Sequence, residues 1–380
     1  MKDSIYNNQA INSSLLHFSP SFQLRRPAPP RSEGRRFGFS MPDTFKMLQP
    51  CKNLGNGRVR ITYFNPDAKS VSVCGTGGSM PETIPMTRDE AGNWTAEFVS
   101  PTGIHVHRYI VDGVTVSNPQ MPYAFCTGEP CNVFETVDES CGWYLMQDVP
   151  HGDIRMDYYR SGYTGRWKAC WIYTPAGYEQ NPDKSYPVLY LQHGAGEDET
   201  GWIDMGKVNY IMDNMIAAGE CKEMLVVMNS GFAFREDDGW SMTGGFMQEL
   251  LCDCMPFIES RYRVKADRDN RALAGLSMGS FQAQQIVFEH PELFSYLGVI
   301  IGGVNRDKFR QHEDVVKLNS QLKVFFASNG EQEPGCEATR ETMAALKSEG
   351  LLGAVFYSCP GYHELTVCRN SLRKLLPLLF

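Results

Sequence analysis

One serine of this chain stands where a nucleophile would. Gly275-Leu276-Ser277-Met278-Gly279 has the pattern G-x-S-x-G and separates the apolar run 271–277 from a helical pattern that ends near His290. A sharp strand-to-helix turn at such a serine exposes its hydroxyl, and the flanking glycines let the two backbones pass closely. Ser241, in GWSMTGG, lacks both the second glycine and a preceding strand, so we reject it. The pattern predicts Ser277 as a nucleophile.

A serine hydroxyl needs a base to take its proton. With the expected chain order of serine, acid and histidine, the candidates beyond the helix after Ser277 are His312 and His363. His312 lies in the charged stretch KFRQHEDVVK, which is typical of a solvated surface. His363 follows a predicted strand and a Pro-Gly turn, where a loop at the carboxyl edge of a sheet would hold a base. We therefore predict His363 as the base.

An acid must fix the tautomer of that imidazole, and three glutamates follow the penultimate predicted strand. Glu337 belongs to the first turn of the next predicted helix, where a carboxylate complements the helix dipole. Glu331 directly follows the turn, where a side chain is ordinarily solvated. Glu333 is clear of the strand and is braced by Pro334. We predict Glu333 as the acid, with Glu331 as the alternative.

Two backbone N–H groups are expected to receive a developing oxyanion. One is that of Met278, at the start of the helix after the serine. The other is that of Ala195 in His193-Gly194-Ala195-Gly196, a glycine-rich loop that follows an earlier apolar run. For His193 itself we expect a role in supporting the loop rather than in the chemistry.

Long apolar runs must position these residues. They cover 186–194, 223–231, 271–277, 296–303, 322–330 and 354–361, and they alternate with helical patterns that include 208–219, 245–262 and 337–350. Continuous apolar strands separated by helices are typical of a parallel sheet covered on both faces. We therefore predict an α/β domain of the α/β-hydrolase type over residues 141–380.

A different pattern precedes that domain. Residues 58–64, 70–75, 93–99, 105–113 and 114–119 alternate apolar and polar side chains with period two between turn residues. Short strands of this kind predict a small, immunoglobulin-like antiparallel β-sandwich, which we assign to residues 43–140. Residues 1–42 mix Pro, Arg, Ser and Gly without hydrophobic periodicity, so we expect a disordered or loosely packed tail.

Composition limits the partners. The 380 residues have a net charge of −8, which does not favour nucleic acid or an anionic membrane surface. The 12 cysteines include no C-x-x-C pair of a zinc or redox site, and we expect no metal and no cofactor. Without a recognisable signal peptide or an apolar window of membrane-spanning length, the expectation is a soluble cytoplasmic protein with reduced thiols. The sequence leaves open whether the protein forms a homo-oligomer.

Three segments together resemble the feruloyl esterase and acetyl-xylan esterase family of esterase-D-like carbohydrate esterases. They are YPVLYLQHGAGEDETGW (186–202), RALAGLSMGSFQA (271–283) and GYH (361–363) followed by RNSL (369–372). The resemblance covers about residues 148–380, and residues 50–140 resemble the early-set, glycogen-debranching-type module that often precedes such domains. It implies the same roles for Ser277, His363 and Glu333 and for the N–H groups of Met278 and Ala195. The chain departs from the family at the acid, which is commonly Asp, at Ser280 in place of a third Gly, and at Cys368 in place of a frequent Trp.

The resulting hypothesis is a serine esterase that releases hydroxycinnamoyl (feruloyl-type) or acetyl groups from small or oligosaccharide esters of plant origin. Trp202, Trp240 and Tyr362 are candidates for contact with a phenolic ring, because aromatic faces suit such a ligand. One alternative is an esterase of catecholate siderophore trilactones, which a cluster of Arg or Lys at the cleft would favour. Another is a carbohydrate-binding protein with a non-catalytic hydrolase-like domain, which binding of plain xylan or starch by residues 43–140 alone would favour.

Overall fold

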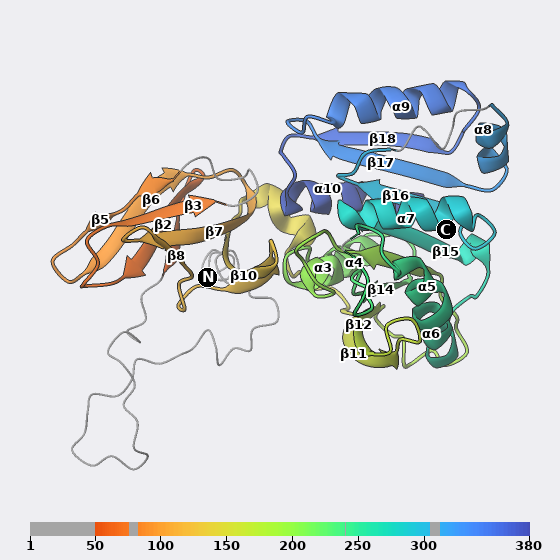
Figure 1. The fold of residues 1–380 in the computed structure, drawn as a ribbon, viewed down its shortest axis with the longest axis horizontal. Coiled ribbons are helices and arrows are strands. Elements are labelled where there is room, and N and C mark those ends of the chain that lie inside the picture. Colours follow the sequence, from red (N-terminus) through yellow and green to blue (C-terminus); the bar gives the residue numbers. More distant parts are fainter. Residues whose placement is uncertain (1–49, 76–82, 240, 305–311) are drawn as a thin grey trace, which may run out of the picture. The chain divides into compact units, whose positions relative to one another are not determined.

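A computed structural model describes residues 50–75, 83–239, 241–304 and 312–380. The chain forms two compact units. The first unit comprises the residues up to Ala124 together with Pro130–Cys141. The second unit comprises Phe125–Glu129 and Gly142–Phe380 (Figure 1). The tail expected at residues 1–42 lies outside the described residues.

Two sheets build the first part of the chain. One has the strand order β1 (Cys51–Gly55), β2 (Arg58–Phe64), β6 (Asn93–Val99), β5 (Thr87–Arg88). The other has the order β4 (Ile84–Pro85), β3 (Val71–Gly75), β7 (Gly103–Val111), β10 (Glu129–Thr136), β9 (Tyr123–Cys126), and β8 (Val114–Val116) pairs with β7. The central strands β2 and β7 are antiparallel to their neighbours.

Alternate side chains of the two sheets form one apolar core. In β2, Val59 and Ile61 are buried whereas Arg60 between them is exposed, because successive side chains of a strand point to opposite faces. Tyr109 and Phe134 of the second sheet belong to the same cluster as Val59 and Ile61. The β-sandwich predicted from the period-two pattern is confirmed.

Among its described residues, the second unit contains one sheet of eight strands. Their order is β11 (Asp153–Arg160), β12 (Trp167–Thr174), β14 (Leu225–Asn229), β13 (Val188–Gln192), β15 (Arg271–Leu276), β16 (Tyr296–Ile300), β17 (Val324–Gly330), β18 (Ala354–Cys359). β12 is antiparallel to both β11 and β14, and all later pairs are parallel. This is the predicted sheet of an α/β-hydrolase.

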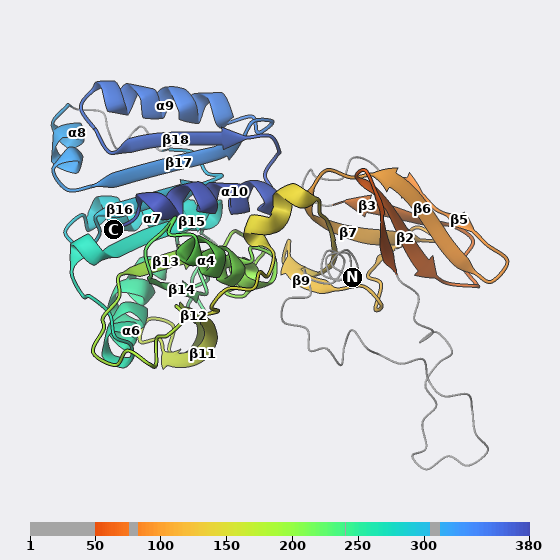
Figure 2. The same ribbon diagram turned by 180° about the vertical axis from the view of Figure 1, so that it is seen from behind.

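Helices cover both faces of this sheet (Figures 1 and 2). Several of these helices contribute apolar side chains to one core that they share with the sheet. They are α5 (Phe246–Glu249), α6 (Met255–Arg261), α7 (Met278–Glu289), α8 (His312–Asn319) and α9 (Cys336–Ser348). The π-helical turn η4 (Leu250–Cys254) lies between α5 and α6. α10 (Leu365–Leu375) packs on the opposite face, where a Cβ added at Gly298 would lie 2.7 Å from the side chain of Leu375. Figure 2 shows α4 (Val208–Ala217) on the side of α10. In the described part of the chain, the other helical segments are α3 (Gly201–Asp204), η3 (Glu139–Tyr144), η5 (Arg268–Asn270) and η7 (Leu376–Leu378).

Within the described ranges, no helix has both the length and the apolar character needed to cross a membrane.

Four parallel strands end at one edge of the sheet and position the loops of interest. β13 ends at Gln192, β15 at Leu276, β17 at Gly330 and β18 at Cys359. Gln192 is in register with Gly275, and Gly330 with Cys359. Because the carboxyl ends of parallel strands meet at the same edge, the segments after these residues are where a ligand site is expected.

Candidate active site

Ser277 occupies a strained turn between β15 and α7. Its φ of 50° and ψ of −114° lie outside the ordinary regions for a residue with a side chain. A Cβ added at Gly275 would lie 2.4 Å from the carbonyl carbon of Gly279, and one added at Gly279 would lie 2.7 Å from both the Cβ of Gln192 and the backbone oxygen of His193. Both glycines are therefore required by close backbone approach.

The backbone around Ser277 is anchored on both sides. Its N–H donates to the carbonyl of Ile300 at 3.0 Å, and its own carbonyl accepts the N–H of Ser280 at 2.9 Å and the Ser280 hydroxyl at 2.6 Å. Ser280 is fully buried, so this departure from the family pattern serves the turn and does not line a pocket. The N–H of Met278 lies in the first turn of α7, where a helix supplies no partner from within itself.

His363 and Glu333 form a hydrogen-bonded pair. His363 Nδ1 lies 2.7 Å from Glu333 Oε1, and the second oxygen of Glu333 accepts the Gly330 N–H at 2.9 Å and the Asn329 amide at 3.1 Å. Burial opposes ionisation of Glu333, but these hydrogen bonds prevail and lower the pKa of the carboxyl below its ordinary value. A carboxylate at Nδ1 keeps the proton there, which leaves Nε2 of His363 for proton transfer.

The other two acid candidates point elsewhere. Glu331 is exposed, and its N–H continues the sheet by donating to Cys359 at 2.8 Å. Glu337 lies in the first turn of α9 and pairs with Arg340 at 3.1 Å. Of the three glutamates, Glu333 is the one that contacts His363.

The glycine-rich loop after β13 lies beside the serine. A Cβ added at Gly194 would lie 3.5 Å from the Cβ of Ser277. Gly196 has φ +83°, and its carbonyl accepts the Gly128 N–H at 2.8 Å. Ala195, between them, is exposed. The loop therefore presents Ala195 at the surface while its glycines make the close contacts.

His193 supports this loop from below. Its Nδ1 lies 2.8 Å from the carbonyl of Gly194, and its Nε2 accepts the Gly231 N–H at 2.9 Å. Because Nε2 is an acceptor, the ring proton is on Nδ1 and donates to Gly194. Burial lowers the pKa of His193. A neutral, fixed imidazole of this kind fits the supporting role expected from the sequence.

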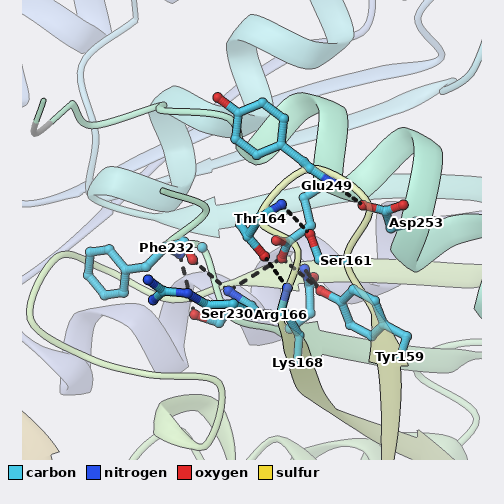
Figure 3. Close-up of polar contacts among 12 residues, drawn as sticks. Tyr159, Ser161, Thr164, Arg166, Lys168, Ser230, Phe232, Glu249 and Asp253 are labelled. Carbon is cyan, nitrogen blue, oxygen red and sulfur yellow. Dashed lines mark hydrogen bonds and ion pairs between the residues drawn. The ribbon is translucent and has the colours of Figure 1, made fainter. Parts of the chain in front are cut away.

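A buried polar network holds the loop after β14, to which Gly231 belongs (Figure 3). Lys168 Nζ donates to the carbonyl of Phe232 at 2.6 Å and lies 3.5 Å from Glu249 Oε1. The Tyr159 hydroxyl donates to the same oxygen of Glu249 at 2.8 Å. The ring of Phe232 is 5.3 Å from that of His193. This loop was not among the site segments predicted from the sequence, although its aromatic SGFAF segment, directly after a predicted strand, was a usable signal.

The three aromatic candidates for ligand contact have different surroundings. Trp202 is 1% exposed, and its indole N–H donates to the carbonyl of Gln192 at 2.8 Å, so the predicted contact with a substrate is not supported. The reason is that α3 turns this residue into the core beneath the loop. Trp240 lies outside the described residues. Tyr362, next to the base, is 48% exposed and therefore remains a candidate for contact with a substrate.

Among the described residues, no three His, Cys, Asp or Glu side chains are grouped as ligands of a metal ion.

Comparison with known proteins finds one matching protein family and related sequences. A family described as "Putative esterase" matches residues 161–324. An endo-1,4-beta-xylanase/feruloyl esterase of Xylanibacter ruminicola is 33% identical over 336 residues, which are 85% of this chain and 45% of that protein. Endo-1,4-beta-xylanase Y of Acetivibrio thermocellus is 31% identical over 146 residues, 36% of this chain and 13% of that protein. The chain thus spans less than half the length of these two relatives.

Solved structures share the fold at lower identity. A ferulic acid esterase of Anaeromyces mucronatus, in complex with ferulic acid, matches with TM-score 0.55 and 20% identity over 64% of this chain and 96% of that one. The enterobactin esterase of Shigella flexneri, in the presence of enterobactin, matches with TM-score 0.61 and 14% identity over 86% of this chain and 94% of that one. The esterase match and the xylanase/feruloyl esterase relative support placement of this chain in the feruloyl and acetyl-xylan esterase family.

Proposed function

We propose that this chain hydrolyses the ester bond between a hydroxycinnamoyl (feruloyl-type) or acetyl group and a plant-derived saccharide. The observation that carries the proposal is the 2.7 Å hydrogen bond between His363 and Glu333, on loops that share the sheet edge with the turn of Ser277. In this proposal Ser277 is the nucleophile, His363 the base and Glu333 the acid. The N–H groups of Met278 and Ala195 form the oxyanion hole.

Acylation follows from these roles. The Oγ of Ser277 attacks the ester carbonyl while Nε2 of His363 takes its proton, and the carbonyl electron pair becomes the oxyanion. Hydrogen bonds from the two backbone N–H groups stabilise that charge. When the tetrahedral intermediate collapses, the bond to the saccharide oxygen breaks and His363 protonates the leaving alcohol. Glu333 stabilises the imidazolium that exists between the two proton transfers.

Deacylation repeats the sequence with water. His363 takes a proton from a water molecule while the water oxygen bonds to the acyl carbon. A second oxyanion then forms in the same oxyanion hole. When this tetrahedral intermediate collapses, the bond between the acyl carbon and Ser277 Oγ breaks. His363 then returns its proton to Oγ. The free carboxylic acid leaves, and the enzyme is restored.

The charge of three loops at the sheet edge, those after β13, β17 and β18, favours an uncharged ester. The segments 193–201, 329–335 and 360–365 contain glutamates and one aspartate but neither Lys nor Arg. The exposed ring of Tyr362 is adjacent to the base, and the ring of Phe232 lies against His193. An aromatic acyl group suits such surroundings, and the named activity of the Xylanibacter relative includes feruloyl esterase.

A second candidate substrate is a catecholate siderophore trilactone. The observation in its favour is that the fold of the Shigella enterobactin esterase matches over 86% of this chain, more than the 64% matched by the Anaeromyces enzyme. Such a substrate is anionic, and the acidic loops named above oppose its binding. We therefore rank it below the neutral ester.

One comparison of rates tests both candidates. Purified protein is assayed side by side with methyl ferulate, p-nitrophenyl acetate and a catechol trilactone, with Ser277→Ala as the blank. We expect a kcat/KM for methyl ferulate well above that for the trilactone. Faster hydrolysis of the trilactone would select the siderophore reaction, and no hydrolysis of any of the three would reject the proposal.

A further inference from the structure

A carboxyl group is buried within the glycine-rich loop. Glu197 is 4% exposed, and its Oε2 accepts the Gly194 N–H at 3.1 Å. A buried carboxylate is expensive unless its surroundings satisfy it. Here the hydrogen-bond donor is a peptide N–H rather than a cation, so the side chain serves the backbone of the loop.

The contact is reciprocal. The N–H of Glu197 donates to the carbonyl of Gly194 at 3.2 Å, while the carboxylate of Glu197 accepts the N–H of Gly194. Together the two bonds close a four-residue turn around Ala195, and the positive φ of Gly196 is what such a turn requires at its third position. The direction of the Ala195 N–H therefore depends on Glu197.

The carboxyl lies close to the reacting residues. A Cβ added at Gly194 would lie 3.6 Å from Glu197 Oε2 and 3.5 Å from the Cβ of Ser277. One added at Gly201 would lie 3.3 Å from the same oxygen. The backbone of Gly194 and Gly201 thus encloses the carboxyl group, and Gly194 separates it from the serine.

We propose that Glu197 is a positioning residue for ester hydrolysis, which holds the Ala195 N–H toward the developing oxyanion. The inference rests on the proposed function, in which the N–H groups of Ala195 and Met278 receive the oxyanion. In this proposal Glu197 is the second carboxyl group, beside that of Glu333, that supports the reaction.

Burial raises the pKa of Glu197 to about 7, and the hydrogen bond from the Gly194 N–H opposes that rise. This bond favours the ionised carboxyl, as expected for a side chain whose partner is the backbone of the loop.

Two substitutions separate the hydrogen bond from the charge. Glu197→Gln keeps an oxygen acceptor but cannot ionise, whereas Glu197→Ala removes both. The substrate is p-nitrophenyl acetate, and kcat, KM and the melting temperature are measured between pH 5 and pH 9. Asp213→Asn is the matched control, since Asp213 is also a buried carboxylate, bonded to Tyr173, Gly152 and His151.

For Glu197→Ala we expect kcat to fall by about 10- to 100-fold with little change in KM, since oxyanion donors act in the transition state. For Glu197→Gln, which can still accept the Gly194 N–H, we expect kcat within about 3-fold of wild type. Asp213→Asn is expected to lower the melting temperature with kcat unchanged.

An unchanged kcat in Glu197→Ala would overturn the positioning role. If that variant does not fold, Glu197→Asp decides: its shorter side chain withdraws the carboxyl from the Gly194 N–H, and a kcat equal to that of wild type would overturn the role. Failure of the proposed function is distinguishable: in that case wild type itself would not hydrolyse the ester, or Ser277→Ala would be as active as wild type.

Discussion

Glu333 connects His363 to the end of a strand. One carboxylate oxygen lies 2.7 Å from His363 Nδ1, and the other accepts the N–H of Gly330, the last residue of β17, at 2.9 Å. Gly330 is in turn paired with Cys359 at the end of β18. The orientation of the imidazole is therefore set by the sheet, and not by its own half-exposed loop.

Amide replacement of this acid tests its role. Glu333→Gln keeps the shape of the side chain but removes the charge that stabilises the imidazolium, so we expect kcat to fall by about 10²- to 10⁴-fold. The acid limb of kcat/KM is expected to move to lower pH, because the pKa of Glu333 lies below its ordinary value and the wild type keeps the charge across that limb. Steady-state kinetics on methyl ferulate between pH 4.5 and pH 9 measures both effects.

Glu331→Gln is the matched control for that experiment. Glu331 is exposed and contributes only its backbone to the sheet, so activity within a few-fold of wild type is expected. The opposite result, a crippled Glu331→Gln beside a nearly normal Glu333→Gln, would move the acid back by two residues.

Removal of the nucleophile should leave the fold intact. Ser277→Ala is expected to lower ester hydrolysis by about 10⁴-fold or more, as for serines of other such triads. Its backbone bonds to Ile300 and Ser280 do not use the hydroxyl of Ser277, so circular dichroism should match wild type. Ser241→Ala is the control, because the Ser241 hydroxyl accepts the N–H groups of Thr243 and Gly244 in its own loop. Retention of a tenth of the activity by Ser277→Ala would exclude the assignment.

Local pattern predicted many of the elements of this fold. The apolar runs became β13 to β18, and the alternating segments became β2, β3, β6, β7 and β8. The sandwich strands β1, β4, β5, β9 and β10 and the antiparallel strands β11 and β12 were not predicted. The G-x-S-x-G spacing also predicted the turn at Ser277, because close backbone approach there can be met only by glycine.

Features that depend on how a loop folds back could not be predicted in the same way. Trp202 was predicted to contact a phenolic ring because it follows the glycine-rich loop closely in the sequence, but the short helix α3 buries it. Glu197 stands among charged residues in the sequence, where solvation is the ordinary expectation, yet its bond to Gly194 turns it inward. Hydrogen bonds between residues near in sequence decide such cases, and composition does not reveal them.

Tyr362 is exposed whereas Trp202 is buried, and this difference gives a prediction about substrate binding. Tyr362→Ala is expected to raise KM for methyl ferulate by about 3- to 10-fold, since one aromatic contact is worth roughly 0.5–1.5 kcal/mol. KM for p-nitrophenyl acetate should change less than KM for methyl ferulate. Trp202→Phe loses the bond to the Gln192 carbonyl and should instead lower the melting temperature, with both KM values unchanged. A rise of KM in Trp202→Phe alone would return that residue to the list of substrate contacts.

The glycine-rich loop offers a test that leaves every proposed catalytic side chain in place. Gly196 has φ +83°, and a Cβ there would lie 2.8 Å from the Cα of Thr127, so Gly196→Ala must shift the loop or strain it. Because Ala195 precedes it directly, we expect kcat to fall by about 10- to 100-fold while KM stays within 2- to 3-fold, the pattern of a displaced oxyanion donor.

The control is Gly219→Ala, just after α4, where φ is +70° but the space around an added Cβ is open. It carries the same backbone penalty of about 1 kcal/mol, and it should lower the melting temperature slightly with kcat unchanged. Equal losses of kcat in the two variants would mean that general destabilisation, and not the position of the Ala195 N–H, explains the effect at Gly196. A loss confined to Gly196→Ala would place the turn from Gly194 to Glu197 within the machinery that stabilises the transition state.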